Sequence, residues 1–167
     1  MRRRFLAFAG LVHHATRALC MVSGSVLTLA VLAIVVLRYG FGIGYIGLQD
    51  LASYAFAVFL ALAVPACLAQ GGHVRVEVLS ERLPPAYLRR ADLAALLFFL
   101  IPVFGFAFWV YLPELRYSWA IREASVETGG LPGLFIVKTV LPLSAALMIV
   151  QGIAAVLRPL PDESTGL

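Results

Sequence analysis

The side chains that could do chemistry are few and scattered along the chain. Three histidines, His13, His14 and His73, and two cysteines, Cys20 and Cys67, could in principle ligate a metal or act as a base or nucleophile. The cysteines lie in separate apolar blocks with no third or fourth soft ligand nearby, which does not fit a zinc site. His73 has only a single glutamate close by. We therefore expect no catalytic residue, no bound metal and no cofactor.

Four long apolar blocks are the elements that position these residues. The chain is 62% hydrophobic and 13% charged, whereas a globular domain is roughly half apolar and about a quarter charged. Each block has the length of about twenty residues that a transmembrane helix needs, and backbone groups in lipid must pair within a helix. The sequence predicts an all-α integral membrane protein, one membrane domain over residues 1–167. The four spans are expected at about 18–37, 51–69, 93–112 and 134–157.

The basic residues predict how the chain is oriented in the membrane. Nine of the 13 Lys and Arg residues lie in the N-terminal flank, between spans two and three, or just after span four. Cytoplasmic segments of membrane proteins carry this excess. Both termini, including the short tail 158–167, are therefore expected to be cytoplasmic. The bias also accounts for the net charge of +4, so nucleic acid is not an expected partner.

Two segments are expected to lie along the membrane surface. Residues 3–16 are basic and partly amphipathic, which favours a position in the headgroup region. The alternative is an export signal, but His13, His14 and Arg17 interrupt the apolar stretch and no small-residue cleavage site follows. Residues 73–90 are expected to form a short in-plane cytoplasmic segment, followed by a turn and an arginine-rich entry into span three.

Arginine and tryptophan are expected to anchor the helices at the two membrane surfaces. Trp and Tyr gather at both interfaces of membrane proteins, and Lys and Arg gather on the cytoplasmic side. The predicted membrane-surface anchors are Arg75, Arg89, Arg90, Trp109 and Trp119.

The centres of the four spans hold almost no ionisable side chain. Lys138 is the exception, and it lies near the outer end of span four, where it can snorkel to the surface. A carrier that moves charged solutes alone usually needs central acids, bases or broken helices. The chain is therefore expected to be an accessory subunit that neither catalyses nor conducts by itself. A free-standing small homo-oligomeric transporter or channel is the alternative.

Several short motifs occur in an order that resembles a known family. "RYGF" closes span one, Asp50 opens span two, "GGHVRVEVLSERLP" follows span two, and "S…LP…LPL" leads into span four. With four spans and cytoplasmic termini, this combination resembles the small membrane subunit of tripartite ATP-independent periplasmic (TRAP) transporters, the DctQ-like family. The chain departs from the family at Gln49, where a second acid is common, and at Pro65, where glycine is typical.

The resemblance implies a role in a secondary importer of the bacterial inner membrane. In this family a large multi-span transport subunit carries the substrate and ion sites, and a periplasmic solute-binding protein delivers an organic acid, often a carboxylate. The small subunit docks on the large one as a scaffold in the lipid bilayer. The expected partner-interface residues are Arg38, Tyr39, Asp50, Tyr54, Gly72 and His73. An ordinary solvated or backbone-bonded histidine remains the alternative at position 73.

Overall fold

The computed structural model describes residues 2–70 and 85–157, and these residues fold into helices joined by short loops. The elements are α1 (Arg2–Phe41), α2 (Ile46–Ala69), α4 (Pro85–Ala95), the π-helical turn η1 (Leu96–Leu100), α5 (Ile101–Ala120) and α6 (Leu134–Leu157). Because α4, η1 and α5 are continuous, four helices are long and apolar enough to cross a membrane. The predicted all-helical class and the four membrane helices are confirmed.

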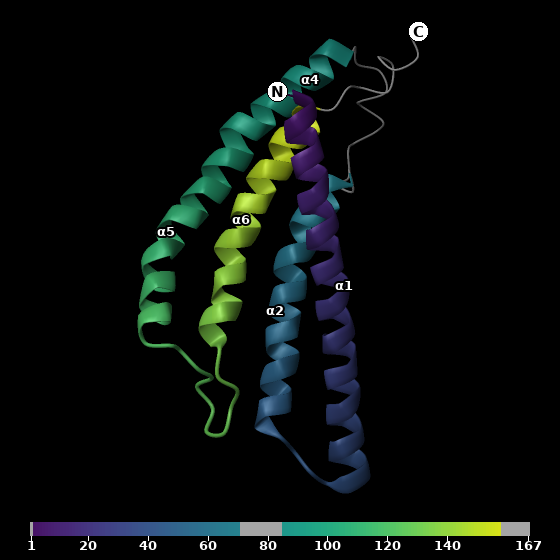
Figure 1. Ribbon diagram of the computed structural model, residues 1–167, viewed down its shortest axis with the longest axis vertical. Coiled ribbons are helices and arrows are strands. Elements are labelled where there is room, and N and C mark those ends of the chain that lie inside the picture. The colour runs from purple at the N-terminus through teal and green to yellow at the C-terminus, as the bar shows by residue number, and fades with distance from the viewer. Residues whose placement is uncertain (1, 71–84, 158–167) are drawn as a thin grey trace.

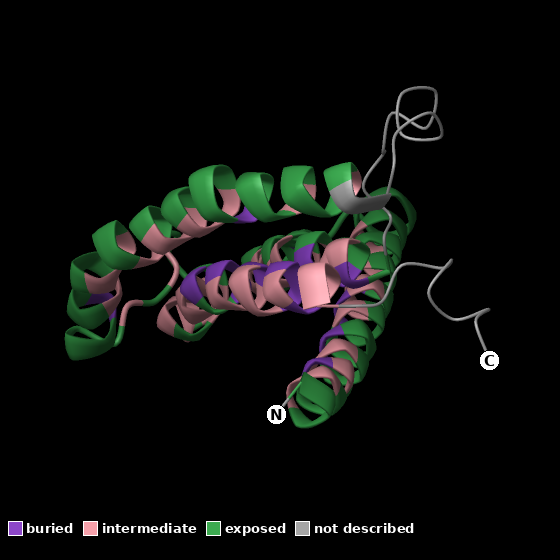
Figure 2. Ribbon diagram, turned by 90° about the horizontal axis from the view of Figure 1, so that it is seen from above, coloured by how far each residue is buried: buried purple, intermediate pink, exposed green. Residues whose placement is uncertain are grey.

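The helices follow one another across the molecule in the order α5, α6, α2, α1 (Figure 1). Helix α6 contacts α5 on one side and α2 on the other, α1 packs along α2, and the start of α1 also reaches α6. Helix α6 has more buried residues than any other helix, whereas most of α5 is exposed (Figure 2). We call the end where α1 begins and α6 ends the N-terminal end, and the opposite end the hairpin end.

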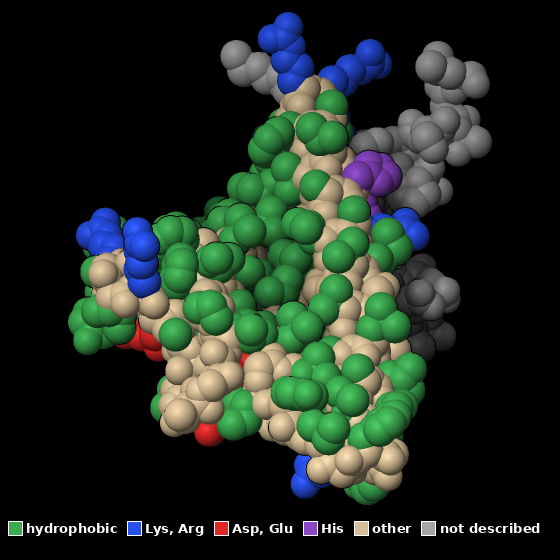
Figure 3. All heavy atoms as spheres, turned by 60° about the horizontal axis from the view of Figure 1, so that its bottom comes forward, with side chains coloured by type: hydrophobic (Ala, Val, Ile, Leu, Met, Phe, Trp, Pro, Cys, Tyr) green, Lys and Arg blue, Asp and Glu red, His purple; other side chains and the backbone are tan. Residues whose placement is uncertain are grey.

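Apolar side chains cover most of the outer surface, and basic side chains lie at its extremities (Figure 3). Exposed large hydrophobic residues are spread over α1, α2 and the α4–α5 rod. In water such a surface would be unstable, but in a bilayer it faces lipid tails or other membrane helices at little cost.

The first helix is longer than the sequence predicted. Residues 3–16 and the span at 18–37 are parts of one 40-residue helix with no break between them. At 1.5 Å per residue it is about 60 Å long, about twice the thickness of the hydrocarbon core. The polar residues between the two segments do not break a helix. The Thr16 hydroxyl donates a hydrogen bond to the Val12 carbonyl, one turn earlier in the same helix, at 2.8 Å. The position of residues 3–16 relative to the membrane surface stays a prediction.

The start of α1 is fastened to the end of α6. Gln151 of α6 is buried and donates from Nε2 to the Ala9 carbonyl at 3.0 Å. Arg2 donates from Nε to the carbonyl of Leu157, the last residue of α6, at 2.9 Å; the last carbonyls of a helix have no donor within the helix. These contacts hold the N-terminal part of α1 along α6 and explain why it does not lie apart as a separate segment.

The third span also extends beyond its predicted limits of 93–112. It begins at Pro85, so residues 85–90 of the expected in-plane segment belong to the rod, and residues 73–84 lie outside the described part of the chain. It ends only at Ala120, because the helix continues through Pro113. In the middle, Ile101 bonds to the Leu96 carbonyl in the wider π pattern, directly before Pro102, which has no N–H to donate. The helix thus has a π turn immediately before the proline.

The hairpin end has two loops, residues 42–45 and 121–133. The first is shorter than predicted, because α1 continues to Phe41 and α2 begins at Ile46 rather than near residue 51. Gly42 has a φ of +70°, a conformation that glycine adopts without strain. Asp50 therefore lies within α2, one turn after its start.

A hydroxyl from α6 replaces a backbone hydrogen bond that is missing in α2. Pro65 lies inside α2 and has no N–H, so it cannot donate to the carbonyl of Ala61 four residues earlier. The Ser144 hydroxyl of α6 donates to that carbonyl at 2.5 Å. Neighbouring helices and Ser or Thr side chains commonly satisfy carbonyls left free by proline in membranes. Ser144 therefore both completes α2 and fixes α6 against it.

Removing the Ser144 hydroxyl should weaken this packing only while Pro65 is present. We expect Ser144→Ala to lower the free energy of unfolding of the purified full-length chain by about 0.6–1.7 kcal/mol, the range for membrane hydrogen bonds. Pro65→Ala gives the Ala61 carbonyl a backbone donor, so Ser144→Ala should cost little in that background. Ser25→Ala is the matched control, because Ser25 bonds within its own helix. If Ser144→Ala lowers the free energy of unfolding equally with and without Pro65, Ser144 does not replace the hydrogen bond that Pro65 removes.

Candidate functional site

Two carboxylates of the hairpin end bind Lys138, in the second turn of α6. Its Nζ lies 3.0 Å from Glu114 Oε1 and 2.6 Å from Glu123 Oε2. The Ser118 hydroxyl donates to the same Glu123 oxygen at 2.5 Å. Glu114 and Ser118 belong to α5, so this network joins α5 and α6 to the loop that connects them.

The same loop is bound to α2 through one residue, Leu131. Its N–H donates to Asp50 Oδ2 at 2.9 Å, and the Tyr54 hydroxyl donates to its carbonyl at 3.1 Å. Asp50 and Tyr54 are four residues apart, which puts them on one face of α2. Both backbone polar groups of Leu131 therefore have partners on α2. We refer to the contacts of Asp50, Tyr54, Ser118, Glu123, Leu131 and Lys138 as the loop clamp.

The backbone conformation of the loop 121–133 places its residues next to these partners. After α5, Arg122 has a φ of 48°, and the Glu123 N–H bonds back to the Ser118 carbonyl at 3.0 Å. This is the Schellman arrangement that commonly ends a helix, with arginine in the position usually held by glycine. It turns Glu123 back toward α5. Position 130 requires glycine, because a Cβ there would collide with the Asp50 carboxylate and with Ser125.

The charge of Glu123 is stabilised by its neighbours. The hydrogen bond from Lys138, and then the one from Ser118, hold the pKa of this carboxyl below its ordinary value of 4.5. Glu123 therefore stays ionised at neutral pH, and its contact with Lys138 keeps its charge-assisted character.

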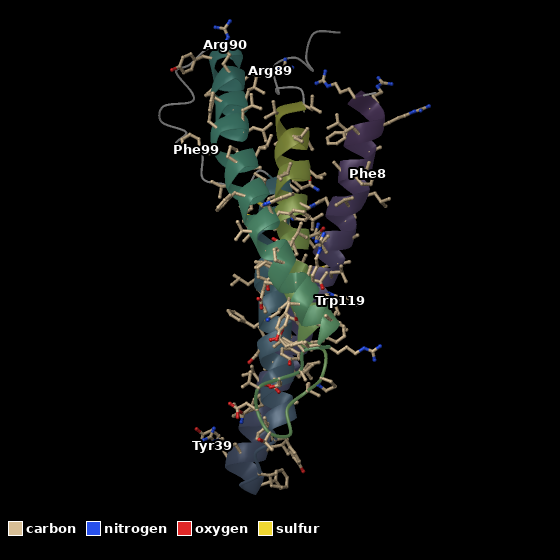
Figure 4. All side chains as sticks on the ribbon, turned by 90° about the vertical axis from the view of Figure 1, so that its left-hand side faces the viewer. Phe8, Tyr39, Arg89, Arg90, Phe99 and Trp119 are labelled. Atoms are coloured by element: carbon tan, nitrogen blue, oxygen red, sulfur yellow. The ribbon has the colours of Figure 1, made fainter. Side chains whose placement is uncertain are left out.

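The structure brings together two of the predicted interface residues and leaves two others exposed. Asp50 and Tyr54 are in the loop clamp, so their described partner is this chain's own loop. Arg38 and Tyr39 lie at the end of α1, with Tyr39 83% exposed (Figure 4). Arg38 lines a depression of about 270 Å³ beside the loop 42–45. No ion pair within the described chain joins Arg38 to Asp50.

The predicted anchors lie at several levels of the third span. Arg89 and Arg90 are exposed at the N-terminal end of the rod (Figure 4). Trp109 is 74% exposed, and Trp119, half exposed, donates from its indole nitrogen to Thr139 Oγ1 at 3.0 Å. Their roles as membrane anchors stay predictions. Three predicted residues, Gly72, His73 and Arg75, lie outside the described part of the chain.

The clamp was missed by sequence reasoning, because its partners are far apart in the chain. Lys138 pairs with residues 15 and 24 positions away, and no local periodicity connects them. Chemically, the arrangement holds a loop. In residues 2–70 and 85–157 no group of three His, Cys, Asp or Glu side chains is placed to hold a metal ion.

The contact between Glu123 and Lys138 should make the loop sensitive to acid but insensitive around neutrality. Because the pKa of Glu123 is lowered in the folded state, its contribution is complete above about pH 4.5 and is lost as the pH falls through the lowered pKa. In a Trp109→Phe variant, Trp119 is the one remaining tryptophan and reports on the loop. Its fluorescence should be constant from about pH 5 to 8 and change in acid. Glu123→Gln should abolish the change; if it persists, another group causes it.

Gly130→Ala should open the clamp, because the added Cβ displaces Asp50 and Ser125. Overpacking of this kind costs about 1–3 kcal/mol, so proteolysis within residues 121–133 should become about 5- to 150-fold faster. Gly40→Ala is the control, since a Cβ at Gly40 meets no atom within 4 Å. Asp50→Asn, which keeps an acceptor oxygen, should accelerate cleavage less than Asp50→Ala. Equal rates for Gly130→Ala and Gly40→Ala would contradict the close approach.

Comparison with known proteins places this architecture in a family. Residues 27–162 match the family described as tripartite ATP-independent periplasmic transporters, DctQ component. The match includes α2, the α4–α5 rod, the loop clamp and α6. No curated protein and no solved structure matched the chain. The four apolar helices and the family together indicate a multi-pass membrane protein. The chain therefore belongs to the DctQ family, the small membrane component of TRAP transporters.

Proposed function

We propose that this chain is a non-catalytic small permease subunit of a TRAP-type secondary importer. It scaffolds a large, ion-coupled transport subunit for the uptake of organic acids delivered by a periplasmic binding protein. The observation that carries the proposal is the family match over residues 27–162. The proposed location is the bacterial inner membrane, with both termini in the cytoplasm.

The distribution of polar groups supports a scaffold rather than a carrier. The charged side chains of the loop clamp bind one another or the loop backbone at one end of the helices. Within the spans, the Ser144 hydroxyl is bonded to a backbone carbonyl of this same chain. Groups that are occupied in this way are poorly suited to bind and release a coupling ion or a carboxylate.

The exposed parts of the hairpin end are the proposed contacts with partner proteins. Arg38 and Tyr39 are free to reach another subunit, since both are exposed at the end of α1. Asp50 and Tyr54 would act on a partner through the loop that they hold. The Gly72–His73 turn remains part of the proposed interface on the strength of the family motif alone.

Affinity purification of the tagged full-length chain from its native membranes in mild detergent tests this function. We expect a large multi-span membrane protein to co-purify in a ratio near one to one, identified by mass spectrometry. The control is an unrelated four-helix membrane protein carrying the same tag. Recovery of this chain alone, or as a homo-oligomer, would overturn the proposal and favour the small independent transporter.

Solute uptake by reconstituted vesicles separates the two functions further. The co-purified subunits should take up an organic acid only when the binding protein is added, and this chain alone should take up none. Uptake by this chain alone would contradict the proposed scaffold function.

A further inference from the structure

An apolar groove lies between the α4–α5 rod and α6, toward the N-terminal end. Its volume is about 500 Å³, and its lining is apolar except for Asp92 near one end. Leu68 of α2 closes part of the groove. Pockets of about 300–1,000 Å³ that are lined mainly by apolar and aromatic side chains, with few polar groups, are typical ligand sites.

Two local features shape this groove. The π turn η1 contributes Leu96, Phe99 and Leu100 to one wall, and single π turns inside α-helices are often found at functional sites. Gly152 of α6 stands opposite, where a Cβ would come within 3.0 Å of the Leu100 side chain. Gly152 therefore lets α6 approach the π turn closely, and Ala155 adds a small side chain to the lining of the groove.

A basic side chain stands just beyond the groove. Asp92 and Ala95 of α4 line it, and Arg89 lies three residues before Asp92, hence one turn further out on the same helix face. Arg90 is rotated by about 100° around the helix axis from Arg89. Both arginines are exposed at the end of α4, and Phe99 lies further along the same rod (Figure 4).

We propose that this groove binds one acyl chain of a bilayer phospholipid, with the lipid phosphate at the guanidinium of Arg89. Phe99 lines the groove and is 71% exposed, so an acyl chain of a lipid can enter beside it from the apolar surface of the rod without crossing water. A cation at the outer end complements a phosphate, which arginine binds through two parallel hydrogen bonds. This site is independent of the transport role proposed above.

Native mass spectrometry of the full-length chain, purified from membranes with any co-purifying subunits, tests the acyl-chain site. We expect one phospholipid to be retained per chain. Ala95→Phe fills the groove and should retain none, whereas Ala94→Phe, on the exposed neighbouring position outside the lining, should retain the lipid. Ala155→Phe fills the groove from α6 and replaces Ala95→Phe if that variant does not fold. Equal retention by the filled and control variants would overturn the proposal.

The phosphate contact is tested on the delipidated full-length chain. Dioleoylphosphatidylglycerol should bind about tenfold more weakly to Arg89→Gln than to the unchanged chain, as expected for the loss of a charge-assisted hydrogen bond. Arg90→Gln should bind it almost as well as the unchanged chain does. Dioleoylglycerol, which has no phosphate, should bind weakly and equally to all three proteins. Equal effects of the two arginine substitutions would show general attraction by basic charge and refute the assigned contact.

Discussion

Every backbone polar group in a lipid-embedded helix needs a partner within protein, and this constraint explains the central position of α6. Pro65 leaves the Ala61 carbonyl of α2 without its normal donor, and water is not available to replace it. Ser144 provides the missing hydrogen bond from α6. A local defect in one helix thus determines which neighbour it takes and at what height. Hydrophobic burial could not do this, because lipid tails are as apolar as leucine side chains.

Polar contacts also join the helices at each of the two ends of the molecule. At the N-terminal end, Gln151 and Arg2 pair with backbone carbonyls and hold α1 on α6. At the hairpin end, the loop clamp joins α2, α5 and α6 through charged side chains such as Lys138 and Glu123. Charge-assisted hydrogen bonds are strong enough to order a glycine-containing loop there. Helix α6 takes part in the contacts at both ends and therefore connects them.

Sequence reasoning predicted the apolar features and missed the specific contacts. Four apolar blocks predict four helices, because length and backbone pairing leave no other structure in lipid. Helix ends were predicted less well: α5 runs through Pro113, and α1 begins at Arg2, because hydropathy marks the lipid-facing part of a helix and not its full length. Neither Leu131 with Asp50 nor Ser144 with Ala61 has a local signal, since these pairs are 81 and 83 residues apart.

A row of four helices cannot enclose a pathway, and this limits what the chain can do alone. Helix α5 at one edge contacts α6 but neither α1 nor α2 to any extent within the described residues, so its far side is open to lipid or to another protein. Since apolar surface alone gives helices little reason to associate in a bilayer, shape and polar contacts at the membrane surfaces must select a partner. We propose that the exposed Arg38 and Tyr39 at the hairpin end are groups of that kind. This arrangement is consistent with the scaffold role that we propose for the chain.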